Sequence, residues 1–146
     1  YVFIGGLAGL LPDLDIAVYY FLSFFGFTID EVHRTFSHNF FVPLIFVLLG
    51  LFFWKFKNKE LGKHHLKLNK IFFVIAFGIF IHIALDPLFY GTITPFYPIS
   101  TFVLGFNLIN LFPSAWQGTI LPTIDAILLI LWMIYLEVKH KISDFI

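Results

Sequence analysis

Aspartate and histidine side chains are concentrated in three short stretches of this 146-residue chain. The chain contains no cysteine, so thiolate ligands and disulfides are excluded. Carboxylate oxygens and imidazole nitrogens together are typical ligands of zinc and of other divalent first-row metals. The residue types therefore predict a metal site with mixed oxygen and nitrogen ligands. The candidate ligands are Asp13, Asp15, His33, His38, His82 and Asp86.

His82 and Asp86 lie four positions apart in the segment IFIHIALDPL. On a helix, residues at this spacing project from the same face, so both side chains can bind one cation. Asp86 is also expected near a helix C-terminus, where the helix dipole disfavours an anion unless a cation or a donor offsets the cost. The alternative is an interfacial histidine that is simply hydrogen-bonded to the neighbouring aspartate.

Asp13 and Asp15 follow Pro12, which is expected to end the preceding apolar helix. In extended backbone, alternate residues point the same way, so we expect both carboxylates to face one point. Two adjacent anions repel each other unless a proton or a metal intervenes. Taken alone, the pair is better explained as a polar turn that ends the helix after Pro12. Beside His82 and Asp86 on the same membrane face, it favours metal ligation.

The segment EVHRTFSHNF contributes His33, Arg34, Ser37 and His38. On one continuous helix His33 and His38 would lie about 140° apart. Both can then bind one metal only if a new helix begins near Ser37, which is a suitable N-cap. Arg34 carries the planar fork that matches phosphate oxygens and is the candidate anion clamp. Alternatively, its side chain extends from the interface toward lipid headgroups.

The composition predicts an integral membrane protein. Hydrophobic residues make up 60% of the chain and charged residues only 12%, whereas soluble domains carry about 25% charged residues. Ionisable groups are costly near lipid, so the few that occur there usually mark function. The formal net charge is zero and names no partner; we expect membrane lipids as partners and no nucleic acid.

The apolar runs predict an all-α fold, a single helical membrane domain over residues 1–146 with about four spans. Residues 16–29 are expected to form a re-entrant or interfacial helix. Residues 89–118, broken by prolines and glycines, are expected to fold over the membrane surface as short segments. The predicted spans are residues 1–11, 39–56, 71–85 and 120–138. The first is expected to be the second half of a helix that begins upstream of Tyr1, and Pro87 is expected to limit the third.

The basic residues predict the orientation. Six of the nine Lys and Arg residues lie in one loop, residues 55–70, and short loops rich in Lys and Arg face the cytoplasm. Lys139 and Lys141 give the C-terminus the same orientation. The helix ends that carry the Asp and His residues then share the opposite, extracytoplasmic face. Three stretches distant in sequence therefore converge on one side of the membrane.

Three motifs in this order resemble the YdjM-like family, small bacterial and archaeal membrane proteins described as metal-dependent hydrolases. They are LPDLD at residues 11–15, HRTFSH at residues 33–38, and His82 with Asp86. The family pattern is roughly Pro-Asp-x-Asp-His, His-Arg-x-x-Thr/Ser-His and His-x-x-x-Asp, and the resemblance covers residues 5–98. The sequence departs from it at Ile16, where the family often has His, and in lacking a His common near the start of the first helix.

The family is similar to zinc-dependent phospholipase C and the P1-type nucleases, helical enzymes that cleave phosphate esters with a zinc cluster. The resemblance implies one or two divalent ions, most readily zinc, bound by the six candidate ligands. It also implies a membrane-embedded hydrolase that acts on a phosphate ester of an amphiphilic or lipid substrate. We expect Arg34 to stabilise the transition-state charge and Asp13 to act as general base.

Two other functions fit parts of the sequence. In the first, the metal is structural or regulatory and joins helices without catalysis. The second is a transporter, which would place polar groups near the bilayer midplane and often shows internal repeats. The middles of the predicted spans contain Phe, Leu, Ile and Val instead, so the transporter ranks lowest.

Overall fold

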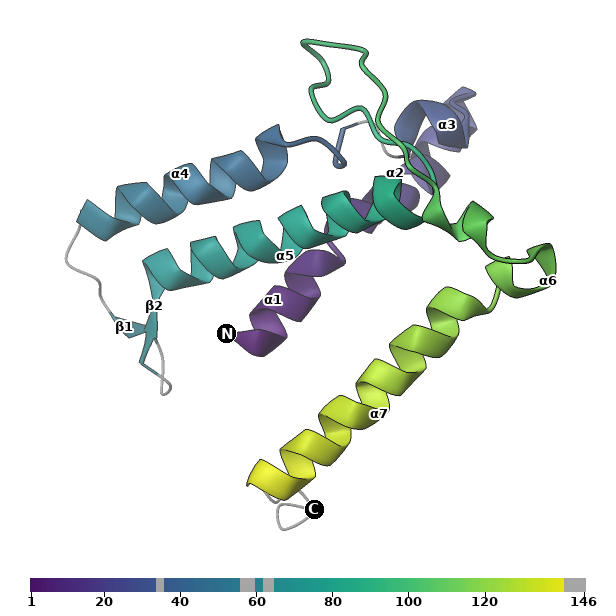
Figure 1. The fold of residues 1–146 in the computed structure, drawn as a ribbon. Helices are drawn as coiled ribbons and strands as arrows, with labels where there is room; N and C mark the ends of the chain where they lie inside the picture. Colours follow the sequence, from purple (N-terminus) through teal and green to yellow (C-terminus); the bar gives the residue numbers. More distant parts are fainter. Residues whose placement is uncertain (34–35, 56–59, 62–64, 141–146) are drawn as a thin grey trace. The chain divides into compact units, whose positions relative to one another are not determined.

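The computed structural model describes residues 1–33, 36–55, 60–61 and 65–140, and it is mainly helical, as the all-α prediction expects (Figure 1). The chain divides into two compact units, Tyr1–Asn107 and Leu108–Ile146. The single domain expected over the whole chain stays a prediction. The second unit contains the 3-10 helix η3 (Leu108–Leu111) and the helices α6 (Ser114–Gln117) and α7 (Ile120–His140).

The first unit carries all six candidate ligands. Its two short strands, β1 (Glu60–Leu61) and β2 (Leu66–Lys67), pair antiparallel in the connection between its two longest helices. The helices, of which η1 and η2 are 3-10 turns, are α1 (Val2–Gly9), η1 (Pro12–Leu14), α2 (Asp15–Leu22), η2 (Ser23–Phe25), α3 (Ile29–Val32), α4 (Phe41–Lys55) and α5 (Leu68–Phe89).

Two described helices are long and apolar enough to cross a membrane, α5 and the Ile120–Lys139 part of α7. A third candidate results if α1 and the helical segment Pro12–Phe25, bent by 43°, form one broken span. α4 is apolar but has 15 residues, a length of about 23 Å against a hydrocarbon core of roughly 30 Å. The described residues therefore hold two or three candidate spans, and the predicted number of about four is not confirmed.

α5 is longer than the predicted helix over residues 71–85, because it begins at Leu68 and continues past Pro87 to Phe89. The predicted stop before Pro87 is wrong. This proline is buried in the last turn of the helix, where it removes only one backbone hydrogen bond. Its carbonyl oxygen accepts hydrogen bonds from the backbone N–H groups of Phe106 and Asn107. The following chain thus packs back onto the end of α5.

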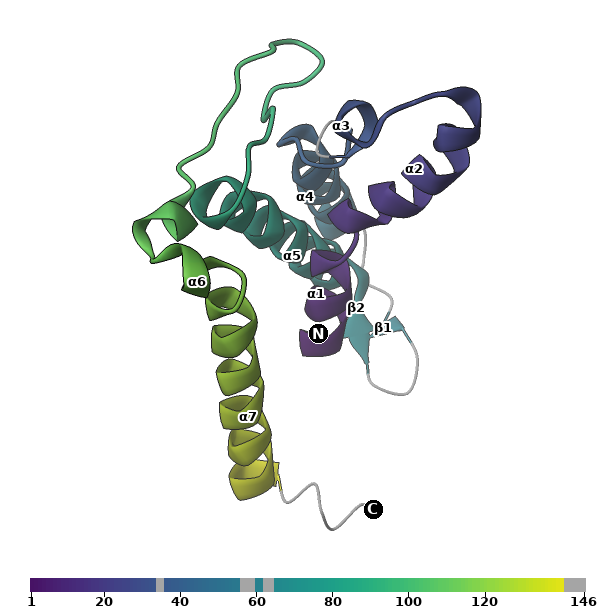
Figure 2. The same ribbon diagram turned by 90° about the vertical axis from the view of Figure 1, so that its right-hand side faces the viewer.

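Helices α1 and α5 lie side by side (Figures 1 and 2), and glycines allow them to pack in direct contact. A Cβ atom at Gly78 would lie 2.5 Å from the carbonyl oxygen of Gly5 and 3.2 Å from the nitrogen of Gly9. Gly5 and Gly9 are four positions apart, the small-residue spacing by which membrane helices approach closely. This crossing fixes the position of η1, which follows α1 and carries Asp13.

A small buried core lies where α1, α5 and the segment after α5 meet. Ala8, Ile79, Ile83 and Ile93 form this core, and partly buried side chains of α4 pack against it. Ile93 pairs with Leu104 through two backbone hydrogen bonds of 2.9 Å. The segment after α5 therefore folds into short pieces, as predicted.

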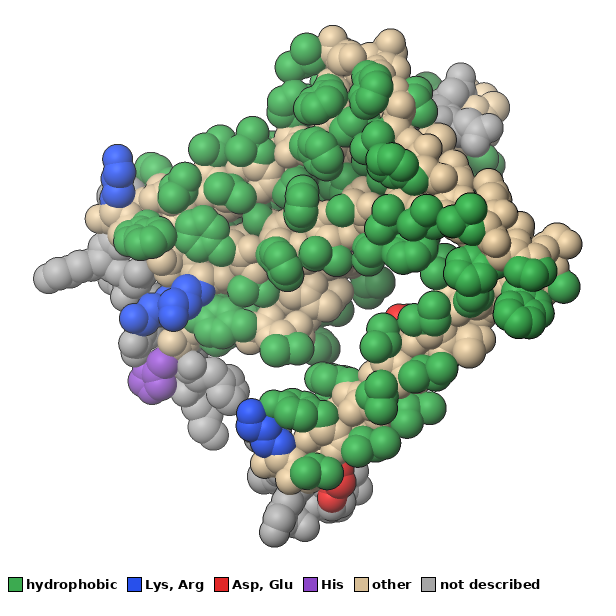
Figure 3. All heavy atoms as spheres, viewed as in Figure 1, with side chains coloured by type: hydrophobic (Ala, Val, Ile, Leu, Met, Phe, Trp, Pro, Cys, Tyr) green, Lys and Arg blue, Asp and Glu red, His purple; other side chains and the backbone are tan. Residues whose placement is uncertain are grey.

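The two ends of the α4–α5 pair differ in chemistry. Hydrophobic side chains cover both helices along their length, and Lys side chains appear where α4 ends and α5 begins (Figure 3). Lys55, Lys67 and Lys70 are exposed there, whereas His82 and Asp86 lie in the last third of α5. The basic residues and the candidate ligands thus occupy opposite ends, and which end faces the cytoplasm stays a prediction.

Candidate metal centre

His38 lies at the centre of the Asp/His cluster and is fully buried. It stands in the connection between α3 and α4, and its two ring nitrogens face different partners. Nε2 lies 3.6 Å from Asp13 Oδ1 and 3.2 Å from Asp86 Oδ2. Nδ1 lies 3.2 Å from Asp15 Oδ2 and 2.9 Å from Ser37 Oγ. The imidazole therefore separates the cluster into two sides, the Nε2 side and the Nδ1 side.

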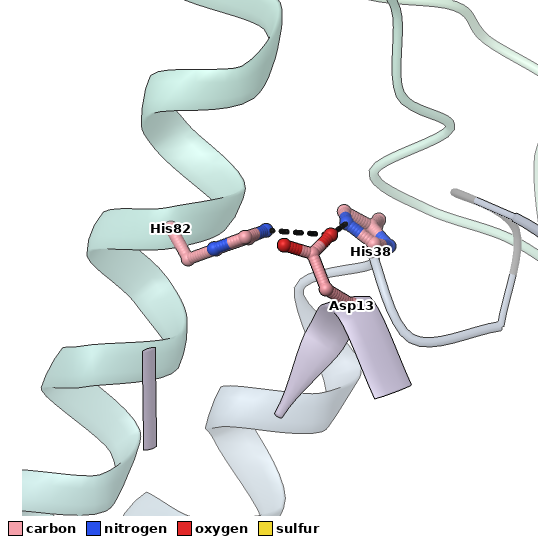
Figure 4. A group of neighbouring side chains, drawn as sticks. All are labelled: Asp13, His38 and His82. Carbon is pink, nitrogen blue, oxygen red and sulfur yellow. Dashed lines mark ion pairs between the residues drawn. The ribbon is translucent and has the colours of Figure 1, made fainter. Parts of the chain in front are cut away.

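The Nε2 side contains Asp13, His38, His82 and Asp86. Asp13 Oδ1 lies between the two histidines, 3.4 Å from His82 Nε2 (Figure 4). Asp86 Oδ2 lies 3.8 Å from the same His82 nitrogen. Ligands of a tetrahedral zinc ion, bound at 2.0–2.1 Å, are about 3.3 Å apart. The nitrogen–oxygen separations of 3.2 to 3.8 Å are close to that value. Ligand atoms of Asp13, His38 and His82 all lie within 4.8 Å of one another, so these three side chains could hold one ion, and Asp86 lies beside the two histidines.

Two atoms on the Nε2 side also lack a hydrogen bond. His38 Nε2 and His82 Nε2 are buried, and neither has a hydrogen-bond partner among the described residues. A buried polar atom left unsatisfied costs about 1–3 kcal/mol. A cation bound to both nitrogens would remove that cost and would offset the negative charge of Asp13 and Asp86. The two nitrogens without hydrogen bonds and the ligand-like distances therefore both favour a cation at this position.

The Nδ1 side is a hydrogen-bonded network. His33 Nδ1 lies 2.8 Å from Asp15 Oδ1, and Ser37 Oγ donates to Asp15 Oδ2 over 2.5 Å. These two separations are hydrogen-bond distances, shorter than the spacing of two ligands on one zinc ion. Ligand atoms of Asp15, His33 and His38 nevertheless all lie within 4.8 Å of one another. The network holds the His38 ring in place. Its carboxylate oxygens and imidazole nitrogens are also the kinds of atom that could bind a second ion.

The hydrogen bonds of Ser37 indicate the tautomer of His38. A serine hydroxyl has one proton, and here it is donated to Asp15. The 2.9 Å contact between Ser37 Oγ and His38 Nδ1 then requires that Nδ1 carry the donated hydrogen. In neutral histidine the other nitrogen, Nε2, consequently has the lone pair that binds a metal. A carboxylate that orients a ligating histidine in this way is common in metal sites.

The backbone of the first motif differs from the prediction. Asp13 lies in the 3-10 helix η1, and Asp15 begins α2, so the predicted extended backbone is wrong. Residues two apart in a helical turn diverge, because each residue rotates by about 100° or more. The two carboxylates consequently do not face one point. Asp13 reaches the Nε2 side of His38, and Asp15 reaches the Nδ1 side.

The predicted N-cap at Ser37 is also wrong. Asn39 takes that role, because its Oδ1 accepts hydrogen bonds from the backbone N–H groups of Phe41, at 3.0 Å, and Val42, at 3.3 Å. An asparagine two residues before a helix is as suitable a cap as a serine. Ser37 is thereby released to bond Asp15 and His38. Its position next to His38 in the HRTFSH motif was the only sequence signal for that role.

Arg34, the candidate anion clamp, lies outside the described residues. His65, which is no candidate ligand, lies at the basic end of the α4–α5 pair, just before β2. Of the six candidate ligands, all are brought together around His38.

Comparison with known proteins identifies a family. A family model described as "YdjM inner membrane protein" matches residues 1–143. No curated protein and no solved structure matches the chain. The match includes all three motifs, the whole of the first unit and residues 108–143 of the second.

Proposed function

Because the chain belongs to the YdjM family of inner membrane proteins, we propose that the cluster is the metal centre of a membrane-embedded hydrolase. Asp13, His38, His82 and Asp86 are the proposed ligands of one divalent ion, with zinc as the proposed metal. The proposal rests on one observation: two buried Nε2 atoms without hydrogen bonds face two carboxylates at ligand spacing. Asp15 and His33 are proposed to support His38, or to bind a second ion if one is present.

The proposed substrate is a phosphate ester of an amphiphilic or lipid molecule. A bound zinc ion would lower the pKa of its water toward neutrality and polarise a phosphoryl oxygen. The protein's own residues then have three tasks. Ser37 and Asp15 orient His38 through Nδ1, which keeps Nε2 directed at the Nε2 side of the cluster. The other two tasks belong to Asp13 and Arg34.

Asp13 is the proposed general base. Its side chain is 44% exposed, against 19% for Asp86 and 18% for His82, so it lies on the accessible side of the cluster. Its Oδ1 faces both histidines, which leaves Oδ2 to accept a proton from an attacking water. Arg34 is proposed to clamp the phosphate, since its guanidinium forms two parallel hydrogen bonds to phosphate oxygens.

A structural or regulatory metal is the second candidate function. The four proposed ligands come from η1, from the connection before α4 and from α5. An ion bound there would tie three separate segments together even without catalysis.

Metal content and turnover distinguish these functions. We expect purified wild-type protein to carry about one divalent ion per chain by elemental analysis and to hydrolyse lipid-like phosphodiesters in detergent. His82→Ala should lose most of the metal and the turnover, because it removes one of four ligands. His140→Ala is the matched control, and it should retain both.

Each other result selects a different function. Metal without turnover of any lipid-like phosphodiester would support the structural or regulatory metal and contradict the hydrolase. Protein that binds no divalent ion under any loading condition would contradict both. Wild-type metal content in His82→Ala would show that the proposed ligand set is wrong.

A further inference from the structure

An apolar groove of about 590 Å³ runs between α1 and α5. It extends along α5 from Val74 to Leu85, a length of about 17 Å at 1.5 Å per residue. Half of a hydrocarbon core of roughly 30 Å is about 15 Å, so the groove is as long as one leaflet is thick. Its wall on the α1 side contains Gly5, Gly6 and Gly9.

One residue joins this groove to the Asp/His cluster. His82 lines the groove, and its Nε2 lies 3.4 Å from Asp13 Oδ1. Apart from His82 and Tyr1, the lining is glycine and hydrophobic side chains. A second groove of about 400 Å³, between α4 and α5, contains none of the candidate ligands. The α1–α5 groove is therefore apolar along its length and meets the polar cluster near one end.

We propose that the α1–α5 groove binds one acyl chain of a membrane phospholipid whose phosphate lies at the Asp13/His38/His82 cluster. This inference rests on the proposed function and names its substrate class, a phospholipid rather than a water-soluble ester. The groove supplies apolar contact and the cluster supplies polar contact, so together they complement an amphiphile. Within a bilayer the acyl chain is already surrounded by hydrocarbon, so its affinity for the groove would come from close packing against the helices and from the polar contacts of the headgroup with the cluster.

The opening of the groove indicates why a lipid is its occupant. Phe77 and Val2, which line it, are 66% and 76% exposed. α5 is a candidate membrane span, and we infer that this open side faces the bilayer, where acyl chains are the surrounding solvent. A phospholipid can then enter sideways without leaving the membrane, while its headgroup stays at the end of α5 that carries the cluster.

Gly6 offers a way to fill the groove without disturbing the helix crossing. A Cβ atom at Gly6 would meet nothing within 4 Å, whereas one at Gly78 would lie 2.5 Å from the backbone of Gly5. Gly6→Leu should therefore occupy the groove and leave α1 and α5 in contact. Gly118 is the matched control, because it also has nothing within 4 Å of an added Cβ and lies outside the groove.

The test uses photocrosslinking in vesicles. Full-length protein is reconstituted with phosphatidylethanolamine, phosphatidylglycerol and a phosphatidylglycerol that carries a photoreactive group on its acyl chain. We expect labelled peptides from residues 2–9 and 74–85 in wild type and in Gly118→Leu. Labelling should be largely lost in Gly6→Leu, because the leucine side chain would fill the space that the acyl chain occupies, and should fall less in Gly6→Ala. Metal content equal to wild type would show that Gly6→Leu is folded.

The outcomes separate this inference from the hydrolase proposal. Equal labelling in Gly6→Leu and wild type would overturn the lipid groove, even if the protein is an active hydrolase. Crosslinking of Gly6→Cys to α7 or to a second copy, without lipid labelling, would overturn it as well, because protein would then cover the groove. Groove labelling in a protein without phosphodiesterase turnover would support lipid binding here and contradict the hydrolase alone.

Discussion

Charged and polar side chains are exposed at one end of the α4–α5 pair and largely buried at the other. At the basic end, Lys55, Lys67 and Lys70 are exposed, and exposed charges are solvated by water at little cost. At the other end, His38 is fully buried and Asp15 is 8% exposed. Burying such groups costs free energy unless hydrogen bonds or ions satisfy them. We therefore expect the lysines to set the orientation of the chain, and we propose the Asp/His cluster as a metal site.

The largest expected difference between these ends is their accessibility from the two sides of the membrane. Since the chain has no cysteine, single cysteines can be introduced at Lys67 and Thr92, both exposed. We expect an impermeant thiol reagent to label Thr92→Cys in intact spheroplasts and Lys67→Cys only after permeabilisation, because basic loops stay cytoplasmic. The reverse pattern would overturn the predicted orientation.

A smaller difference is expected within the Asp/His end, between residues that hold metal and a residue that holds substrate. Arg34→Lys keeps the charge but loses the bidentate fork. We expect phosphodiester turnover to fall roughly ten- to a thousandfold, the scale of one positioned electrostatic group, with metal content unchanged. Loss of metal in Arg34→Lys would mean that Arg34 positions the ligands and does not clamp the phosphate.

The smallest effect should come from the Nδ1 side of His38. Ser37→Ala removes a hydroxyl that bonds both Asp15 and His38, and changes to such supporting groups cost about 10–100-fold in metal affinity. We expect a loss near tenfold, because Asp15 Oδ2 still lies 3.2 Å from His38 Nδ1. Chelator competition measures it. Ser23→Ala is the control, since the Ser23 hydroxyl donates to the Tyr20 carbonyl in its own helical turn. Equal affinities in the two variants would mean that the Ser37 hydroxyl does not support the metal site.

Local sequence patterns were sufficient for the class of the protein and for its candidate residues. The apolar runs predict membrane helices because an isolated stretch of chain near lipid must satisfy its own backbone hydrogen bonds. The spacing of His82 and Asp86 predicts a shared helix face, and both lie on α5 as expected. The three motifs identify six candidate ligands, and all of them lie around His38.

The tertiary structure decided which candidate ligand faces Nδ1 of His38 and which faces Nε2. The contact of Gly78 with Gly5 sets the position of η1, and the helical turn there sends Asp13 and Asp15 to opposite sides of His38. Ser37 joins the network, since Asn39 caps α4 in its place. The physical reason is that helix propensity and hydrophobic periodicity depend on residues only a few positions apart, whereas these placements depend on packing between segments that are distant in sequence.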